Sequence, residues 1–119
     1  MAAYRPRRGV HGARLSELAA LDDHGFRDRF RHTPIRRTGR DRMVRNTLIA
    51  IGNSKDESLA DAAVRLLRDN SALVRGAAVW ALAQLSPSTL RRQRKSGMQD
   101  ESDSSVLREW RLALEETAP

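Results

Sequence analysis

The chain has 119 residues, the length of one domain with a modest hydrophobic core. It contains no cysteine, which excludes a disulfide framework, a zinc site built on thiolates and a cysteine-ligated iron–sulfur cluster. The apolar runs are too short to span a bilayer, so we expect a soluble cytoplasmic protein.

The net charge of +7 is unevenly distributed along the chain. Residues 1–46 hold twelve arginines and five acidic residues, whereas the basic and acidic residues of the remaining segment balance. The planar guanidinium of arginine suits phosphate recognition better than a lysine ammonium does. The segment therefore predicts nucleic-acid binding, and a solvated basic surface without a ligand is the alternative.

A flexible N-terminal segment and one helical domain are predicted. Residues 1–14 form a flexible basic N-terminus, because Pro6, Gly9 and Gly12 interrupt helical periodicity and favour extended backbone up to residue 13. Residues 15–119 form a helical domain, since alanine, leucine and arginine dominate its composition.

Two short helices open the helical domain. The first covers residues 15–21 and places three leucines on one face. Asp22 or Asp23 can cap the second helix, in which Phe26 and Phe30 are four residues apart. We expect these phenylalanines to anchor the N-terminal segment on the helices that follow.

A basic segment punctuated by proline and glycine comes next. Thr33-Pro34 ends the second helix, and Thr38-Gly39 provides a break before a helix over about residues 40–52. This helix buries Val44, Leu48 and Ile51, and Gly52-Asn53 is a stop signal at its end. The arrangement brings a flexible, arginine-rich loop next to a helix N-terminus, where anions bind readily.

The rest of the chain also predicts helices. We expect a polar, flexible segment at residues 96–105, with Gly97 and several acidic residues. The expected helices cover residues 57–68, a segment from a Ser71 cap to Leu85, a short segment from Pro87 to Lys95, and residues 105–116.

Parts of the sequence repeat with a period near 30 residues. Residues 69–74 match residues 101–106 at a shift of 32, and Val44-Arg45 matches Val74-Arg75 at a shift of 30. Two helices per period predict a HEAT-like solenoid of about three units. Arg75 is expected to bind the acidic turn of its own or the neighbouring repeat, and Trp80 to be half-buried at a repeat edge.

The sequence lacks the motifs of an autonomous enzyme. His11, His24 and His32 have no metal-ligand spacing, and no residue pair stands out as nucleophile and base. We therefore predict no catalytic residues and no metal site.

Several segments match a known family in the expected order. They are Leu18–Asp23 with Phe26 and Phe30, Thr33–Arg40, Arg45–Asn53, and Val74–Gly76 with Trp80–Leu82. Through them the chain from residue 15 onward resembles the C-terminal region of the tRNA epoxyqueuosine reductases. The resemblance implies an all-α, HEAT-like fold that helps hold tRNA. In that family the cobalamin domain and two [4Fe–4S] clusters lie in an N-terminal catalytic part that has no counterpart here, so no cofactor is expected in this chain.

The resulting hypothesis is a tRNA-binding helical module, with tRNA and a separate catalytic subunit as its partners and no membrane contact. Capping or hydrogen bonds within the fold explain the two asparagines of the predicted site equally well. A HEAT-like protein–protein adaptor for an acidic partner, or a non-functional gene fragment, are the alternatives. The predicted RNA-binding residues are Arg36, Arg37, Arg40, Arg42, Arg45, Asn46 and Asn53.

Overall fold

The computed structural model describes the backbone of residues 4–118 and the side chains from Gly12 to Ala118. This part of the chain is all-helical, as predicted, and none of its helices combines the length and the hydropathy of a membrane-spanning segment. The α-helices are α1 (Tyr4–Ala19), α2 (Asp23–Arg29), α3 (Arg40–Asn53), α4 (Ala60–Leu66), α5 (Ala72–Leu85), α6 (Pro87–Gln99) and α7 (Ser104–Glu116). Two 3-10 helices, η1 (Pro34–Thr38) and η2 (Glu57–Leu59), precede α3 and α4.

Helix α1 begins earlier than predicted. Extended backbone was expected up to residue 13, but the helix starts at Tyr4, so that prediction is wrong. Pro6 lies in the first turn, where backbone N–H groups have no partner within the helix and proline costs little. Gly12 is buried, and a Cβ there would lie 2.9 Å from a carboxylate oxygen of Asp56. The glycine interpreted as a helix breaker therefore allows α1 to pack closely against the start of η2.

The boundary between a flexible residue 1–14 segment and the helical domain stays a prediction. Residues 4–14 share helix α1 with residues 15–19. The N-terminal basic side chains of Arg5, Arg7 and Arg8 lie outside the described side chains.

Side-chain caps set the helix starts. The Asp22 carboxylate accepts a hydrogen bond from the Gly25 N–H at 2.7 Å, and the Ser71 hydroxyl accepts one from the Val74 N–H at 3.3 Å. Both caps confirm the sequence signals. Gly39 precedes α3 with φ 85°, a left-handed conformation that favours glycine, so the predicted break lies where it was expected.

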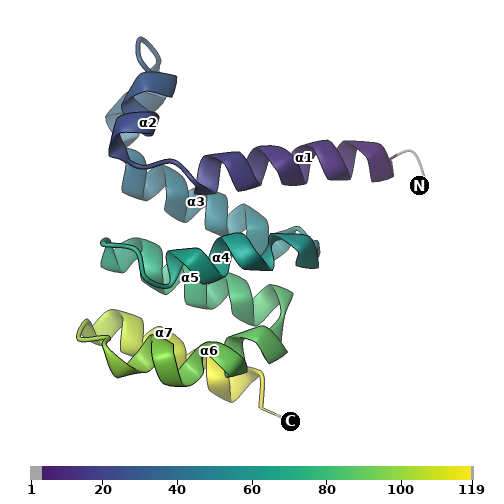
Figure 1. The fold of residues 1–119 in the computed structure, drawn as a ribbon, viewed down its shortest axis with the longest axis vertical. Helices are drawn as coiled ribbons and strands as arrows, with labels where there is room; N and C mark the ends of the chain where they lie inside the picture. The colour runs from purple at the N-terminus through teal and green to yellow at the C-terminus, as the bar shows by residue number, and fades with distance from the viewer. Residues whose placement is uncertain (1–3, 119) are drawn as a thin grey trace.

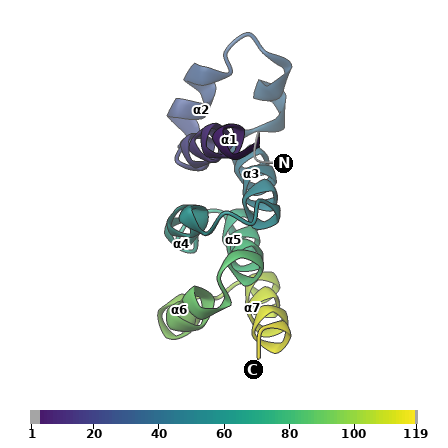
Figure 2. The same ribbon diagram turned by 90° about the vertical axis from the view of Figure 1, so that its right-hand side faces the viewer.

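The helices form two layers. Figures 1 and 2 show α3, α5 and α7 stacked in one layer and α4 and α6 in the other, with α1 and α2 at the N-terminal end. Helix α5 is central and packs most extensively against α3 and α7. The assembly is flat, with extents of 42 × 38 × 17 Å.

The repeat has two registers. The residues that precede α3, α5 and α7, namely Gly39, Ser71 and Asp103, are 32 residues apart in both intervals. The buried stripes of α3 and α5 are instead 30 residues apart, so α3 begins two residues earlier relative to its stripe. The stripes are Val44, Leu48 and Ile51 in α3, and Val74, Ala78 and Ala81 in α5, all with no exposed surface.

Two glycines allow close helix contacts through tryptophan. A Cβ on Gly52 would lie 2.5 Å from the Trp80 ring, and a Cβ on Gly97 would lie closer still to Trp110. Helix α3 ends at Asn53, as predicted, but Gly52 lies inside it and makes room for α5. Trp80 is half-buried, as expected, and its position at a repeat edge stays a prediction.

The C-terminal half differs from the prediction in two helices. Helix α6 continues to Gln99, so residues 96–99, expected in a flexible segment, are helical. The reason is packing, because Gly97 receives the Trp110 ring and Met98 packs against the core. The helix expected at residues 57–68 consists of η2 followed by the shorter α4.

The phenylalanine anchor is confirmed. The Phe26 and Phe30 rings lie 5.1 Å apart between centroids, and Phe26 is 2% exposed within the core. They hold α2 against the start of the helical stack.

Candidate nucleic-acid interface

Four of the seven predicted RNA-binding residues lie along one face of α3. The other three follow Arg42 by three, four and eleven residues, so all four lie on one side of the helix, opposite its buried stripe. Arg45 is half-buried and the other three are exposed. The residues of this α3 stripe are Arg42, Arg45, Asn46 and Asn53.

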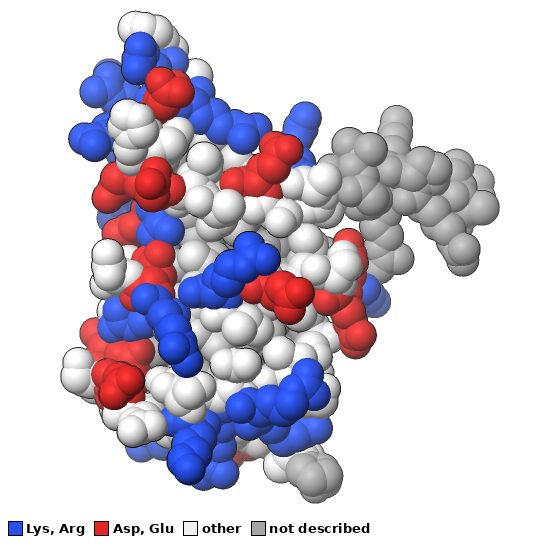
Figure 3. Space-filling view, in the orientation of Figure 1, with Lys and Arg blue, Asp and Glu red and all other residues white. Residues whose placement is uncertain are grey.

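Arg36 and Arg37 lie on η1, directly before α3, and both are exposed. The segment expected as a flexible loop forms a 3-10 helix, because Pro34 has a fixed φ suited to the first helical position. Among the described residues, neither arginine forms an ion pair. Figure 3 shows basic side chains gathered at the end of the molecule that carries α2 and η1.

Arg40 has an intramolecular role. Its guanidinium donates two hydrogen bonds of 2.8 Å to the Asp69 carboxylate and a third, also of 2.8 Å, to the Leu21 carbonyl. The side chains of Arg40 and Asp69 are only 11% and 12% exposed. The bonds to Asp69 raise the pKa of Arg40 despite its burial. We therefore leave Arg40 out of the proposed RNA interface.

Burial and hydrogen bonding have opposite effects on the pKa of Asp69. Burial would raise the pKa of its carboxyl group, but the hydrogen bonds from Arg40 and from the Ser71 N–H outweigh burial and hold the pKa below its ordinary value. The ionised form is thus the one that the fold stabilises.

Arg75 forms the intramolecular ladder that the sequence predicted. It donates hydrogen bonds of 2.8 and 3.0 Å to the Glu101 carboxylate in the turn before α7. It also donates to the carbonyls of Asp69 and Asn70 in its own turn. The Glu101 side chain is 4% exposed, and the bonds from Arg75 lower its pKa.

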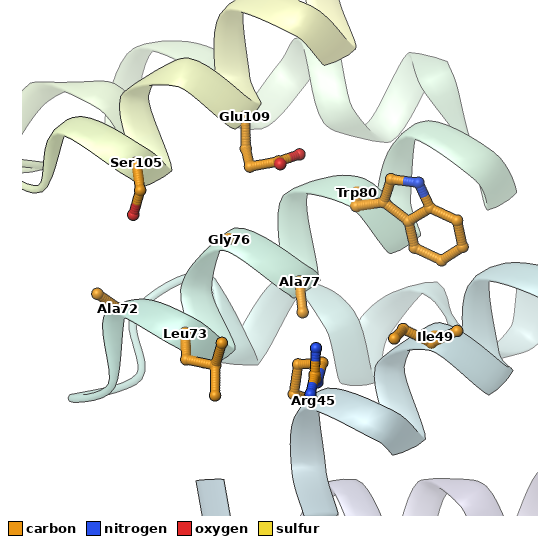
Figure 4. Close-up of a pocket in the computed structure, with 9 residues that line it drawn as sticks. All are labelled: Arg45, Ile49, Ala72, Leu73, Gly76, Ala77, Trp80, Ser105 and Glu109. Carbon is orange, nitrogen blue, oxygen red and sulfur yellow. The ribbon is translucent and has the colours of Figure 1, made fainter. Parts of the chain in front are cut away.

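Arg45 is the counterpart of Arg75 at the shift of 30, but it does not join the ladder. Asp69 occupies the corresponding acidic turn, and Arg40 already binds it. The Arg45 Nε is buried and has no hydrogen-bond partner among the described residues. Arg45 lines a groove of about 390 Å³ on the outer side of α3, α5 and α7 (Figure 4).

A second hollow adjoins the α3 stripe. It has a volume of about 530 Å³ and is lined by Ile35 and Thr38 of η1, Asn46 of α3, and residues of α1 and α2. The α3 stripe therefore lies between two surface hollows, with Arg45 on one side and Asn46 on the other.

Helix α6 carries a basic cluster that the sequence analysis missed. The helix contains no acidic residue, and Figure 3 shows its basic side chains at the end of the molecule opposite η1. The charge count concealed this cluster, because acidic residues elsewhere in the C-terminal segment balance it. The acid-free run was the signal that could have revealed it. The cluster consists of Arg91, Arg92, Arg94 and Lys95, all exposed.

The side chains of this sequence do not fit an iron–sulfur cluster. The sequence has no cysteine to bind an iron–sulfur cluster. The described residues contain no group of three or more His, Asp or Glu that could hold a metal ion.

The fold and the surface define an all-α protein with an arginine-rich face. No protein-family model matches the chain. It is 40% identical over 82 residues to the epoxyqueuosine reductase of Xanthomonas campestris pv. campestris, covering 68% of this chain and 23% of that protein. It is 39% identical over 83 residues to the epoxyqueuosine reductase of Alicycliphilus denitrificans, covering 63% of this chain and 23% of that protein.

Solved structures agree with these relatives in fold. A crystal structure of an epoxyqueuosine reductase with an epoxyqueuosine-modified tRNA-Tyr stem loop superposes with a TM-score of 0.80. The identity is 23%, and the match covers 88% of this chain and 28% of that one. The chain is therefore similar to one part of the epoxyqueuosine reductases, as its motifs indicated, and it spans about a quarter of the length of the curated relatives it matches.

Proposed function

We propose that this chain is a tRNA-binding module that acts in queuosine modification of tRNA. The observation that carries the proposal is the α3 stripe with η1 beside it. Two exposed arginines on η1, one on α3 and the half-buried Arg45 lie close in sequence, and none of them forms an ion pair among the described residues. The similarity to part of the epoxyqueuosine reductases, and to a structure of one solved with a tRNA stem loop, supports RNA as the ligand.

The proposed architecture is a HEAT-like solenoid of about three units. The 32-residue spacing of the starts of α3, α5 and α7 supports it, as does the alternation of helices between two layers. Each unit would bury its apolar face against its neighbours, which explains the central position of α5.

The proposed mechanism is contact with the phosphate backbone. Guanidinium groups of Arg36, Arg37 and Arg42 replace condensed counterions, so affinity falls steeply with salt and discriminates little between sequences. Reduction of epoxyqueuosine to queuosine, with cobalamin and iron–sulfur clusters, belongs in this proposal to a catalytic part outside this chain. The module holds the tRNA for that part.

The double variant Arg36→Ala/Arg37→Ala tests the site. Loss of two phosphate contacts should weaken tRNA binding about tenfold near 0.1 M salt and reduce the magnitude of the log–log salt slope by about 1.5. Binding is measured by fluorescence anisotropy of labelled tRNA over a range of salt concentrations.

The matched control is Arg94→Ala/Lys95→Ala, which removes the same charge from α6 in the other layer. We expect a smaller loss of affinity from this variant. Equal losses from the two double variants would show that net charge alone drives binding, and an unchanged affinity after the η1 substitutions would refute the site.

An adaptor for an acidic protein is the second candidate function. The α6 cluster favours it, because these cations lie outside the proposed RNA face and have no acidic residue on their own helix. Competing RNA separates the two functions, since it should displace tRNA from the chain but leave an adaptor bound to its acidic partner.

A further inference from the structure

The groove beside the α3 stripe has a hydrogen-bond donor on one side and an acceptor on the other. Figure 4 shows Arg45 of α3 and Glu109 of α7 on opposite sides of α5, where Gly76 contributes no side chain. Trp80 closes one end. The groove thus offers a hydrogen-bond donor, an acceptor and an aromatic wall around a space of about 390 Å³.

One donor of Arg45, which lines this groove, is unsatisfied. The Arg45 Nε is buried from solvent and has no partner among the described residues, although buried donors are nearly always paired. A buried unpaired donor destabilises the free protein. A ligand in the groove removes that penalty if the Arg45 side chain turns on binding so that its guanidinium donates to the ligand.

The Glu109 carboxylate limits the classes of ligand that the groove can bind. Glu109 is half-buried and forms no ion pair among the described residues. A carboxylate disfavours a phosphate at this position but accepts a hydrogen bond from an amino or imino N–H group. The ligand must therefore present donors and acceptors together.

The remaining walls are apolar. Ile49 and Leu73 are 38% and 45% exposed, which is high for large aliphatic side chains, and Ala77 and the half-buried Trp80 continue the surface. A flat, aromatic group with polar edges fits such a surface.

We propose that the groove binds one unpaired nucleobase of an RNA strand held along the α3 stripe. A nucleobase has an apolar face for Trp80 and carries N–H donors and acceptor atoms along its edge for Glu109 and Arg45. Ile49 lies on the same face of α3 as Arg42 and Arg45, so a strand bound to the stripe passes the groove. This inference rests on the proposed RNA-binding function and adds to it a preference for unpaired over paired RNA.

Tryptophan fluorescence tests the occupancy of the groove. The chain has two tryptophans, and Trp110 is 1% exposed in the core, so Trp80 is the one that reports ligand contact. A stem loop should change the emission on binding, whereas a fully paired duplex with the same stem should bind without the change. In a Trp80→Phe variant the stem loop should still bind, without the emission change.

Glu109→Gln tests the acceptor, with Glu116→Gln, an exposed acid on the same helix, as control. Both variants remove one negative charge, which by itself tightens binding to any RNA. If Glu109 accepts from a base, its variant should instead bind the stem loop about fivefold more weakly, with no weakening for the duplex.

The outcomes of these experiments distinguish failure of RNA binding from failure of the nucleobase site alone. If the chain binds neither RNA at low salt, the proposed function and this inference both fail. If it binds both RNAs with the same Trp80 response, or if Glu109→Gln behaves like Glu116→Gln, only the nucleobase site is refuted. An emission change that follows protein concentration rather than RNA would assign the groove to a second copy of the chain and refute the inference as well.

Discussion

At the scale of single residues, the pairing of Asp69 with Arg40 leaves Arg45 without an acidic partner among the described residues. The turn before α5 offers one carboxylate, and Arg40 binds it through two hydrogen bonds. Relative to its buried stripe, α3 begins two residues earlier than α5 does. Arg40 is the first residue of α3, and from there its guanidinium reaches the Asp69 carboxylate. Arg45 is consequently free of the ladder in which its counterpart Arg75 is held, and it lines the surface groove instead.

Arg75→Ala tests the energetic role of the ladder. The substitution leaves the nearly buried Glu101 carboxylate without its partner, so the free energy of unfolding should fall by about 3 kcal/mol. Urea unfolding followed by circular dichroism at neutral pH measures it. Arg108→Ala, at an exposed position on α7, should change the stability by less than about 0.5 kcal/mol. An Arg75→Ala protein as stable as the Arg108→Ala control would contradict the assigned role.

At the scale of the elements, two glycines inside helices allow neighbouring helices to pack closely. Gly52 and Gly97 lie inside helices. They receive the ring of Trp80 from α5 and the ring of Trp110 from α7, respectively. Glycine weakens a helix interior, so its presence at both positions is explained by the packing that it permits. The third helical glycine in this stack, Gly76, has ordinary space around it.

Alanine at these glycines should therefore have opposite effects. Gly52→Ala places a methyl group against the Trp80 ring and should destabilise the protein by about 2 kcal/mol. Gly76→Ala meets the nearest side chain, Glu109, at 3.6 Å and should stabilise it by about 0.5 kcal/mol through helix propensity. Thermal unfolding of the two variants gives the comparison. Equal effects of the two substitutions would show that ring packing at Gly52 is unimportant.

The features that depend on residues close in sequence could be predicted from the sequence. The Asp22 and Ser71 caps, the break at Gly39 and the buried stripe of α3 all follow from residue type and spacing, and all are confirmed. The start of α1 and the end of α6 could not be predicted, because Gly12 and Gly97 act through residues distant in sequence. For the same reason the sequence could not distinguish Arg40 from Arg45 within the predicted site. Only the fold shows that Asp69 is within reach of Arg40.

At the scale of the whole molecule, a flat two-layer stack presents separate surfaces for different contacts. The α3 stripe and the groove lie on the layer of α3, α5 and α7, whereas the α6 cluster lies on the other layer. The chain spans about a quarter of its curated relatives, so a module that holds tRNA while other residues perform the chemistry is consistent with its size. The proposed function of the α3 stripe, tRNA binding, can be tested on the isolated chain.

The most direct test is the affinity of the purified chain for total tRNA at about 50 and 200 mM salt. An acidic protein serves as the control ligand. We expect binding to tRNA that weakens at least roughly tenfold between the two salt concentrations, as counterion release requires, and no binding to the control. Absence of tRNA binding at the lower salt concentration, or equal binding to the acidic protein, would refute the proposed tRNA-binding function.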